Sequence, residues 1–173
     1  MTGEAGSAAR RVELLGCPFD PLTLEEAVER AAGFVSSGAF GQGCGVNLDQ
    51  LALMEADPTF AEAVQACELI LADGAPVVWL ARRRGLAVPE RVPAIDLFDA
   101  LLPRCAAEGW PVYLLGARAE VLAEARAALE ARHRGLVVGG SHHGWFEPGD
   151  EEAIVADIAA SGARMLFVGI SSP

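Results

Sequence analysis

The sequence has no lysine. Its 13 basic residues are all arginine and stand against 24 acidic residues, so the formal net charge is −11. Such an acidic chain is a poor candidate for a nucleic-acid-binding protein, because that affinity comes largely from basic groups that neutralise phosphates. An anionic ligand would have to be held locally, by arginine side chains and backbone N–H groups.

Long apolar runs are also missing. The richest apolar stretch, Leu69–Leu80, is interrupted by Asp73 and falls short of the roughly 20 residues that span a bilayer. The apolar segment Val12–Leu15 is much shorter than the core of a signal peptide. We therefore expect a cytoplasmic protein.

Cysteine is scarce and shows no metal or disulfide pattern. The four cysteines include no Cys-x-x-Cys pair, and three of them lie in apolar runs. This pattern favours buried free thiols in a reducing compartment over a disulfide framework. The four are Cys17, Cys44, Cys67 and Cys105.

The rest of the composition is typical of one globular domain. The chain has 173 residues, of which 52% are hydrophobic and 21% are charged. A chain of this length buries about 70% of its unfolded surface, which is enough for a core without disulfides. We expect a flexible N-terminal tail at residues 1–11 and a single domain at residues 12–173.

Short apolar runs alternate with helical patterns along that domain. This alternation predicts an α/β fold with a mostly parallel sheet and helices on both faces. The glycine-rich stretches Gly38–Gly45 and Gly139–Pro148 are predicted to break the regular elements. The predicted strands are Val12–Leu15, Val46–Asn47, Leu69–Leu71, Pro111–Leu115, Leu136–Val138 and Met165–Val168. Helices are predicted to start at Thr23, with Glu26 at capping-box spacing, and at Asp57-Pro58, and to cover residues 50–55, 76–84, 95–108, 118–132 and 150–160.

The carboxyl ends of the predicted strands mark the candidate site. In a parallel α/β sheet, ligands bind beyond these ends. The residues found there are Asn47, Asp73-Gly74, Gly116, the loop His142–Phe146 and Gly169–Pro173.

Asp73 is the first candidate for chemistry. It follows a buried strand and precedes Gly74 and a helix, so its carboxylate could accept a proton from a hydroxyl nucleophile. The alternative is that Asp73 caps the helix that follows it, as aspartate often does.

Two further positions, Asn47 and Arg91, each admit a functional and a structural interpretation, and two other features have a structural one. Asn47 could bind a sugar or a base edge, or be a turn residue. Arg91 could hold a phosphate, or pair with a neighbouring surface carboxylate. The run Arg82–Arg84 ends a helix and is explained by the helix dipole, and Asp96 is most simply an acid in a first helical turn.

The sequence lacks the residue patterns that several kinds of functional site require. The sequence has no Gly-x-Gly-x-x-Gly, so Leu115–Arg118 only weakly supports a dinucleotide-binding oxidoreductase. It has no Asp-x-Asp pair, and beyond His142-His143 the only other histidine is His133, so a metal site is not expected. The polar and aromatic loop His142–Phe146 is instead interpreted as lining a ligand.

Six sequence blocks follow one another at defined positions: Asn47–Leu51, Leu71–Trp79, Pro89–Leu97, Tyr113–Gly116, His142–Phe146 and Phe167–Pro173. Together they resemble the WecG/TagA/CpsF glycosyltransferase family, over the chain from about Val12 to its last residue. The resemblance implies a Rossmann-like α/β fold. It also implies inverting transfer of an N-acetylmannosamine-type sugar from a UDP donor, with no cofactor and no required metal.

The same resemblance implies the acceptor and the roles of individual residues. The acceptor is a polyprenyl-diphosphate-linked sugar at the inner membrane face, used for teichoic acid, common antigen or exopolysaccharide. By position, Asp73 is similar to the proposed general base, Asn47 to a donor-site asparagine, and Arg91 to an arginine that holds the donor. The remaining substrate-binding candidates are Gly74, Asp96, Gly116, His143, Gly144 and Gly169.

Two departures from the family pattern bear on activity. Gly45 stands where the family has threonine, two residues before the asparagine. The family also continues past the final proline with a basic segment, and we expect peripheral membrane contact only where that segment is present. The alternative function is a non-catalytic nucleotide-sugar-binding or assembly module with the same fold, and a homo-oligomer is left open.

Overall fold

The computed structural model describes residues 10–170. The chain forms two compact units, Met1–Leu97 and Phe98–Pro173. Residues 1–9 of the expected N-terminal tail, and residues 171–173 of the last sequence block, lie outside the described residues. Arg11, at the end of that tail, is held by the carboxylate of Asp20 at 3.2 Å and by the carbonyl of Cys67 at 2.8 Å.

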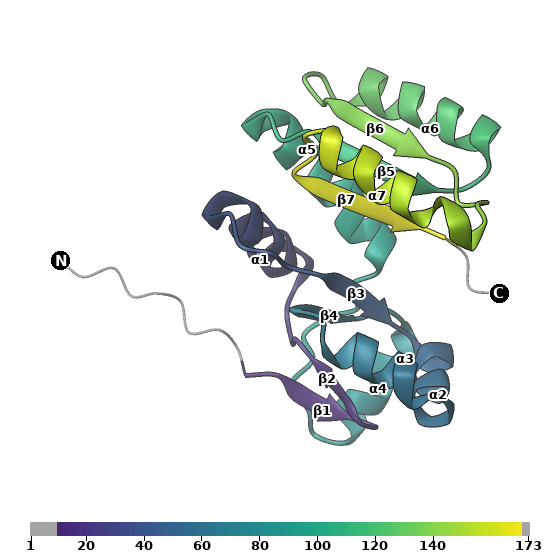
Figure 1. Cartoon of the computed structure of the whole chain (residues 1–173). Helices are drawn as coiled ribbons and strands as arrows, with labels where there is room; N and C mark the ends of the chain where they lie inside the picture. Colours follow the sequence, from purple (N-terminus) through teal and green to yellow (C-terminus); the bar gives the residue numbers. More distant parts are fainter. Residues whose placement is uncertain (1–9, 171–173) are drawn as a thin grey trace. The chain divides into compact units, whose positions relative to one another are not determined.

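The first unit combines a hairpin and a parallel strand pair with helices (Figure 1). Its strands are β1 (Val12–Leu14) and β2 (Cys17–Phe19), which pair antiparallel, and β3 (Gly43–Val46) and β4 (Leu69–Ala72), which pair parallel. Its helices are α1 (Leu24–Ser37), α2 (Leu48–Ala56), α3 (Pro58–Gln65) and α4 (Ala75–Arg83). Helix α5 (Ala94–Glu108) starts in this unit and continues into the second.

Strand β4 is the centre of the first unit, and all four of its residues are buried. Leu69 and Leu71 pack with residues of α1, whereas Ile70 and Ala72 pack with residues of α2, α3 and α4. Because successive strand side chains point to opposite faces, β4 needs helices on both sides to be covered. This explains its uninterrupted apolar sequence.

Local signals set the helix ends of this unit as predicted. Thr23 and Glu26 form a reciprocal capping box at the start of α1, and Gly38 ends that helix with a φ of 71°. Asp57 accepts hydrogen bonds from two backbone N–H groups at the start of α3, and Pro58 follows at the first helical position.

The second unit is a three-stranded parallel sheet in the order β6-β5-β7. Val112 and Leu114 of β5 pack with side chains of α5 and α6, while the Tyr113 hydroxyl donates to Asp157 of α7. The helices therefore cover both faces of this sheet. The elements are β5 (Val112–Gly116), α6 (Ala119–Arg132), β6 (Val138–His142), a 3₁₀ turn (Pro148–Asp150), α7 (Glu151–Ala160) and β7 (Met165–Gly169).

The predicted α/β class with mainly parallel strands is confirmed, and three local predictions are wrong. The strand Cys17–Phe19 is missed, and Gly43–Gly45 belong to β3 rather than to a helix-breaking stretch. Strand β6 covers Val138–His142 instead of Leu136–Val138. Its glycines serve close packing, since an added Cβ at Gly140 would lie 2.5 Å from the Tyr113 ring.

The cysteines agree with the prediction of free thiols. All four are free, and Cys17, Cys67 and Cys105 are buried. Burial raises the pKa of the Cys17 thiol to about 12 and that of Cys105 to about 11, so neither is a ready nucleophile. Across residues 10–170, the helices are too short or too polar to cross a bilayer.

Tyr113 provides a direct test of the packing between β5 and α7, because it is the single tyrosine of the chain. Burial, and then the Asp157 carboxylate 2.6 Å from the hydroxyl, raise the pKa of Tyr113 to about 12. The pKa of tyrosine in the unfolded chain is about 10. The stability that the neutral Tyr113 hydroxyl gives the fold is therefore present below pH 10 and lost as the pH approaches 12.

We expect an alkaline titration of tyrosinate absorbance to have its midpoint well above 10. Asp157→Asn should lower the midpoint without restoring the free value, because burial remains. A native midpoint near 10, the value of free tyrosine, would show that this hydroxyl is not packed as described.

Candidate active site

The paired ends of β3 and β4 bring Asn47 and Asp73 together. Val46 lies opposite Ala72 in the parallel register, and the N–H of Asp73 donates to the carbonyl of Val46 at 3.0 Å. Asn47 and Asp73 follow these two residues directly, so both leave the sheet at the same edge. This is the edge at which parallel α/β sheets bind ligands.

Asp73 does not cap the helix that follows it, so the alternative interpretation of this residue is wrong. Helix α4 starts after Gly74 and has no side-chain cap. The Oδ2 atom of Asp73 instead accepts a hydrogen bond of 3.2 Å from the N–H of Ala94, the first residue of α5. In the described chain, this is the only hydrogen bond of the carboxylate, which leaves Oδ1 available to a substrate hydroxyl.

Gly45 leaves the space that the Asp73 side chain occupies. Gly45 is in β3, next to the end of β4, and a Cβ added there would lie 2.9 Å from both Cβ and Oδ2 of Asp73. That distance is shorter than carbon and oxygen atoms tolerate, so a side chain at position 45 would displace the carboxylate. Glycine at position 45, in place of the expected threonine, therefore leaves room for the side chain of the candidate base.

Asn47 is the N-cap of α2 rather than a simple turn residue. Its Oδ1 accepts from the N–H of Gln50 at 3.1 Å, and its own N–H donates to the Gln50 side chain at 2.8 Å. These bonds fix the orientation of the amide, and any contact with a ligand falls to its NH₂ group. Gly74 packs against it with a φ of 154°, a conformation that other residues rarely adopt.

Arg91 and Asp96 form an ion pair with 3.5 Å between Nη2 and Oδ2. The side chains are 51% and 46% exposed, so the pair is screened by solvent and adds little stability. Asp96 lies in the first turn of α5, as predicted. The guanidinium of Arg91 therefore remains accessible to an anion.

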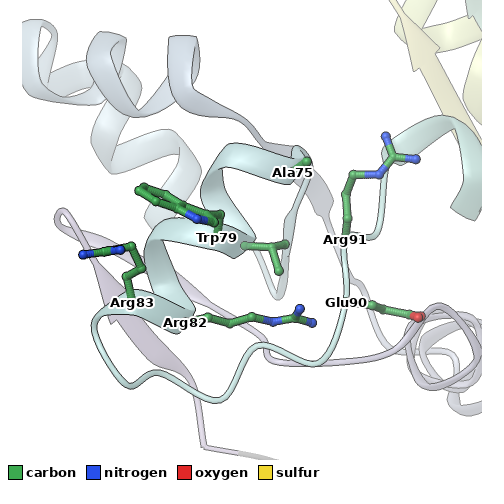
Figure 2. A pocket seen from close by; sticks show the side chains of 7 residues that line it. Ala75, Trp79, Arg82, Arg83, Glu90 and Arg91 are labelled. Atoms are coloured by element: carbon green, nitrogen blue, oxygen red, sulfur yellow. The ribbon is translucent and has the colours of Figure 1, made fainter.

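A groove runs between α4 and the chain segment around Arg91 (Figure 2). It has a volume of about 550 Å³, within the range of small-molecule sites. Trp79 is 60% exposed, and the Arg83 guanidinium lies 5.2 Å from the centre of its ring. The lining residues are Ala75, Val78, Trp79, Arg82, Arg83, Glu90 and Arg91.

In the second unit, three of the predicted glycines meet at one point. Gly116 lies opposite Gly169 in the β5–β7 register, and a Cβ on Gly116 would be 2.3 Å from the Gly169 carbonyl oxygen. The N–H of Gly144 donates to the carbonyl of Ala117 at 2.9 Å. A Cβ on Gly144 would lie 3.1 Å from the Cα of Gly116, so close approach of backbones explains the glycines at 116 and 144.

His143 lies beside this point and lines a second hollow of about 370 Å³. Its Nδ1 accepts from the N–H of Trp145 at 3.3 Å. The hollow also includes the start of α6, where Arg118 is an N-cap without a side-chain bond, so N–H groups of the first turn remain for a ligand. Trp145 on its rim is 72% exposed.

The sequence profile of the Glycosyl transferase WecG/TagA/CpsF family matches residues 12–173. The chain belongs to this family. It is therefore a glycosyltransferase, with a sugar donor and an acceptor as substrates, that acts in the synthesis of cell-surface polysaccharides. The matched range includes the β3–β4 edge, the α4 groove and the glycine-lined strand ends of the second unit.

The predicted site residues fall into two groups, one in each unit. Sequence reasoning did not select the α4 residues Trp79, Arg82 and Arg83. A signal was present: in a helix, spacings of three and four residues from Ala75 place Val78, Trp79 and Arg82 on one face. The first group is Asn47, Asp73, Gly74, Arg91 and Asp96, and the second is Gly116, His143, Gly144 and Gly169.

Gly45→Ala tests the packing of the candidate base. The new Cβ should turn the Asp73 carboxylate away from the Ala94 N–H and destabilise the protein by about 1 kcal/mol, the worth of one hydrogen bond. Transfer activity should fall with it. Urea denaturation and a transfer assay measure the two effects.

Gly33→Ala is the matched control, because it lies inside α1 with nothing within 4 Å of an added Cβ. It should be neutral or stabilising, since alanine is the better helix former. Equal behaviour of the two variants would contradict the steric role of Gly45.

Proposed function

We propose that this glycosyltransferase transfers an N-acetylmannosamine-type sugar, with inversion, from a UDP donor to a polyprenyl-diphosphate-linked sugar. The observation that carries the proposal is the Asp73 carboxylate at the end of β4, oriented by one backbone hydrogen bond and otherwise without a partner among residues 10–170. Such a group can take the proton of a hydroxyl nucleophile.

The proposed reaction is a single displacement. The acceptor hydroxyl gives its proton to Asp73, and its oxygen forms the new bond to the anomeric carbon of the donor sugar. The bond from that carbon to the diphosphate oxygen breaks, and UDP leaves with the electron pair. A fixed carboxylate contributes by orientation as well as by proton transfer.

Arg91 is proposed to hold the donor diphosphate. Its guanidinium is half-exposed, and its ion pair with Asp96 leaves donor groups for a second anion. A guanidinium can also stabilise the charge that develops on the leaving diphosphate. Gly116, His143, Gly144 and Gly169 remain proposed substrate-binding residues, supported by the free N–H groups and the hollow of the second unit.

Asp73→Asn tests the proposed base. The amide cannot accept the proton, so transfer should fall by about 10²- to 10⁴-fold. UDP-sugar binding and the unfolding transition should change little, because the amide oxygen can still accept the Ala94 N–H. UDP release in the presence of a lipid-linked acceptor measures the rate, and titration calorimetry measures binding.

Full turnover by the Asn variant would reduce Asp73 to a structural partner of α5. If the wild type binds UDP-sugar but neither protein transfers it, the non-catalytic binding module becomes the better description of this chain.

Arg91→Ala tests the donor contact. A charge-assisted bond to a diphosphate contributes about 1.5–3 kcal/mol, so UDP-sugar affinity should fall by tenfold or more. Arg84→Ala removes the same charge from an exposed position outside the groove and should have no such effect. Equal affinities of Arg91→Ala and wild type would place the donor elsewhere.

A further inference from the structure

The α4 groove is a cationic patch on an acidic chain. Residues 75–91 contain four of the 13 arginines and only one of the 24 acidic residues. That one acid, Glu90, does not neutralise the groove: its carboxylate accepts the N–H of Leu24 at 2.5 Å, and in Figure 2 it points away from α4. The groove is therefore suited to an anion.

The charges of the groove are held in place. Arg82 donates to the backbone carbonyls of Val88 and Pro89, which orient its guanidinium without cancelling its charge. Arg83 lies over the Trp79 ring at 5.2 Å, a cation–π contact that keeps both side chains together on the surface. Figure 2 shows Arg82 extending toward the segment of Glu90 while Trp79 and Arg83 extend side by side.

The groove also has an apolar wall. Ala75, Val78 and Trp79 line it along α4, and the indole of Trp79 is 60% exposed. An exposed tryptophan beside arginine is a combination that suits the boundary between a charged headgroup and a hydrocarbon chain. A ligand that matches both walls carries a phosphate or diphosphate and an apolar chain.

The groove and the proposed base are close in sequence. Ala75, which lines the groove, is two residues after Asp73, and Arg82 lies seven residues further along α4, about 10 Å at 1.5 Å per residue. That length accommodates one sugar ring between a hydroxyl at Asp73 and a diphosphate at Arg82 and Arg83.

We propose that the α4 groove binds the lipid-linked acceptor, with its diphosphate at Arg82 and Arg83 and its first isoprene units on Trp79. This assignment rests on the proposed function for the identity of the acceptor. It adds Trp79, Arg82 and Arg83 as residues that determine acceptor specificity, distinct from the proposed donor contact at Arg91.

The test is calorimetric titration with three probes: farnesyl diphosphate, inorganic pyrophosphate and UDP. Wild type should bind farnesyl diphosphate more tightly than pyrophosphate. Trp79→Ala should weaken farnesyl diphosphate binding by about tenfold or more through the lost apolar contact, weaken pyrophosphate binding much less, and leave UDP unchanged. Trp79→Phe, which keeps an apolar ring, should recover part of the affinity and guards against misfolding of the alanine variant.

Arg83→Ala and Arg84→Ala form the matched pair for charge. Both are exposed and carry the same charge, but only Arg83 lines the groove. Arg83→Ala should weaken the binding of farnesyl diphosphate and of pyrophosphate several-fold, and Arg84→Ala should leave both affinities within twofold of the wild type. Equal losses in the two variants, or a Trp79→Ala effect on UDP rather than on farnesyl diphosphate, would overturn the assignment.

Binding of the same variants to vesicles of the anionic lipid phosphatidylglycerol is the last measurement. Vesicle binding that falls equally in Arg83→Ala and Arg84→Ala, without a farnesyl diphosphate site, would mark a general membrane surface and overturn the proposal. Failure of the proposed function can be told apart from failure of the groove assignment, because these titrations measure binding and need no catalytic turnover. Asp73→Asn with full activity would refute the base while leaving the groove intact, whereas normal farnesyl diphosphate binding by Trp79→Ala would refute only the groove.

Discussion

The hydrogen bond from the Ala94 N–H to the Asp73 carboxylate is the contact on which the candidate active site depends. It joins the end of β4 to the start of α5 across 21 residues of sequence. The bond forms because Gly45 leaves room for the carboxylate and because the N–H of Val92 donates to Ala72 at 2.9 Å, which brings the segment before α5 to the strand end. Backbone groups thus orient the proposed base.

Both units have glycines at or beside their strand ends. Gly45 and Gly74 flank Asp73 in the first unit, and Gly116 meets Gly169 in the second. An added Cβ at Gly45 or Gly116 would meet a neighbouring group, and another residue at Gly74 would require a strained backbone. Glycine destabilises a strand because it loses more backbone entropy on folding than other residues do. At these positions the need for space near the site is met at the expense of that stability.

The sequence predicted what depends on local signals and missed what depends on distant neighbours. The capping pair Thr23–Glu26 and the position of Asp73 after a buried strand could be predicted, because each rests on adjacent residues. The partner of Asp73 could not, since Ala94 carries no side-chain signal for a backbone contact. Gly45 and Gly140 suggested loops for a related reason: they pack against Asp73 and Tyr113, and these distant neighbours are not part of the local pattern.

Asp73 is proposed to receive the proton of the acceptor hydroxyl, and separate measurement of kcat and of UDP-sugar affinity in Asp73→Asn tests this most directly. The variant should lose kcat by about 10²- to 10⁴-fold, because an amide cannot accept the proton. Its UDP-sugar affinity should equal that of the wild type, since the amide oxygen can still accept the Ala94 N–H. An Asn variant with the kcat of the wild type would assign the proton transfer to another residue.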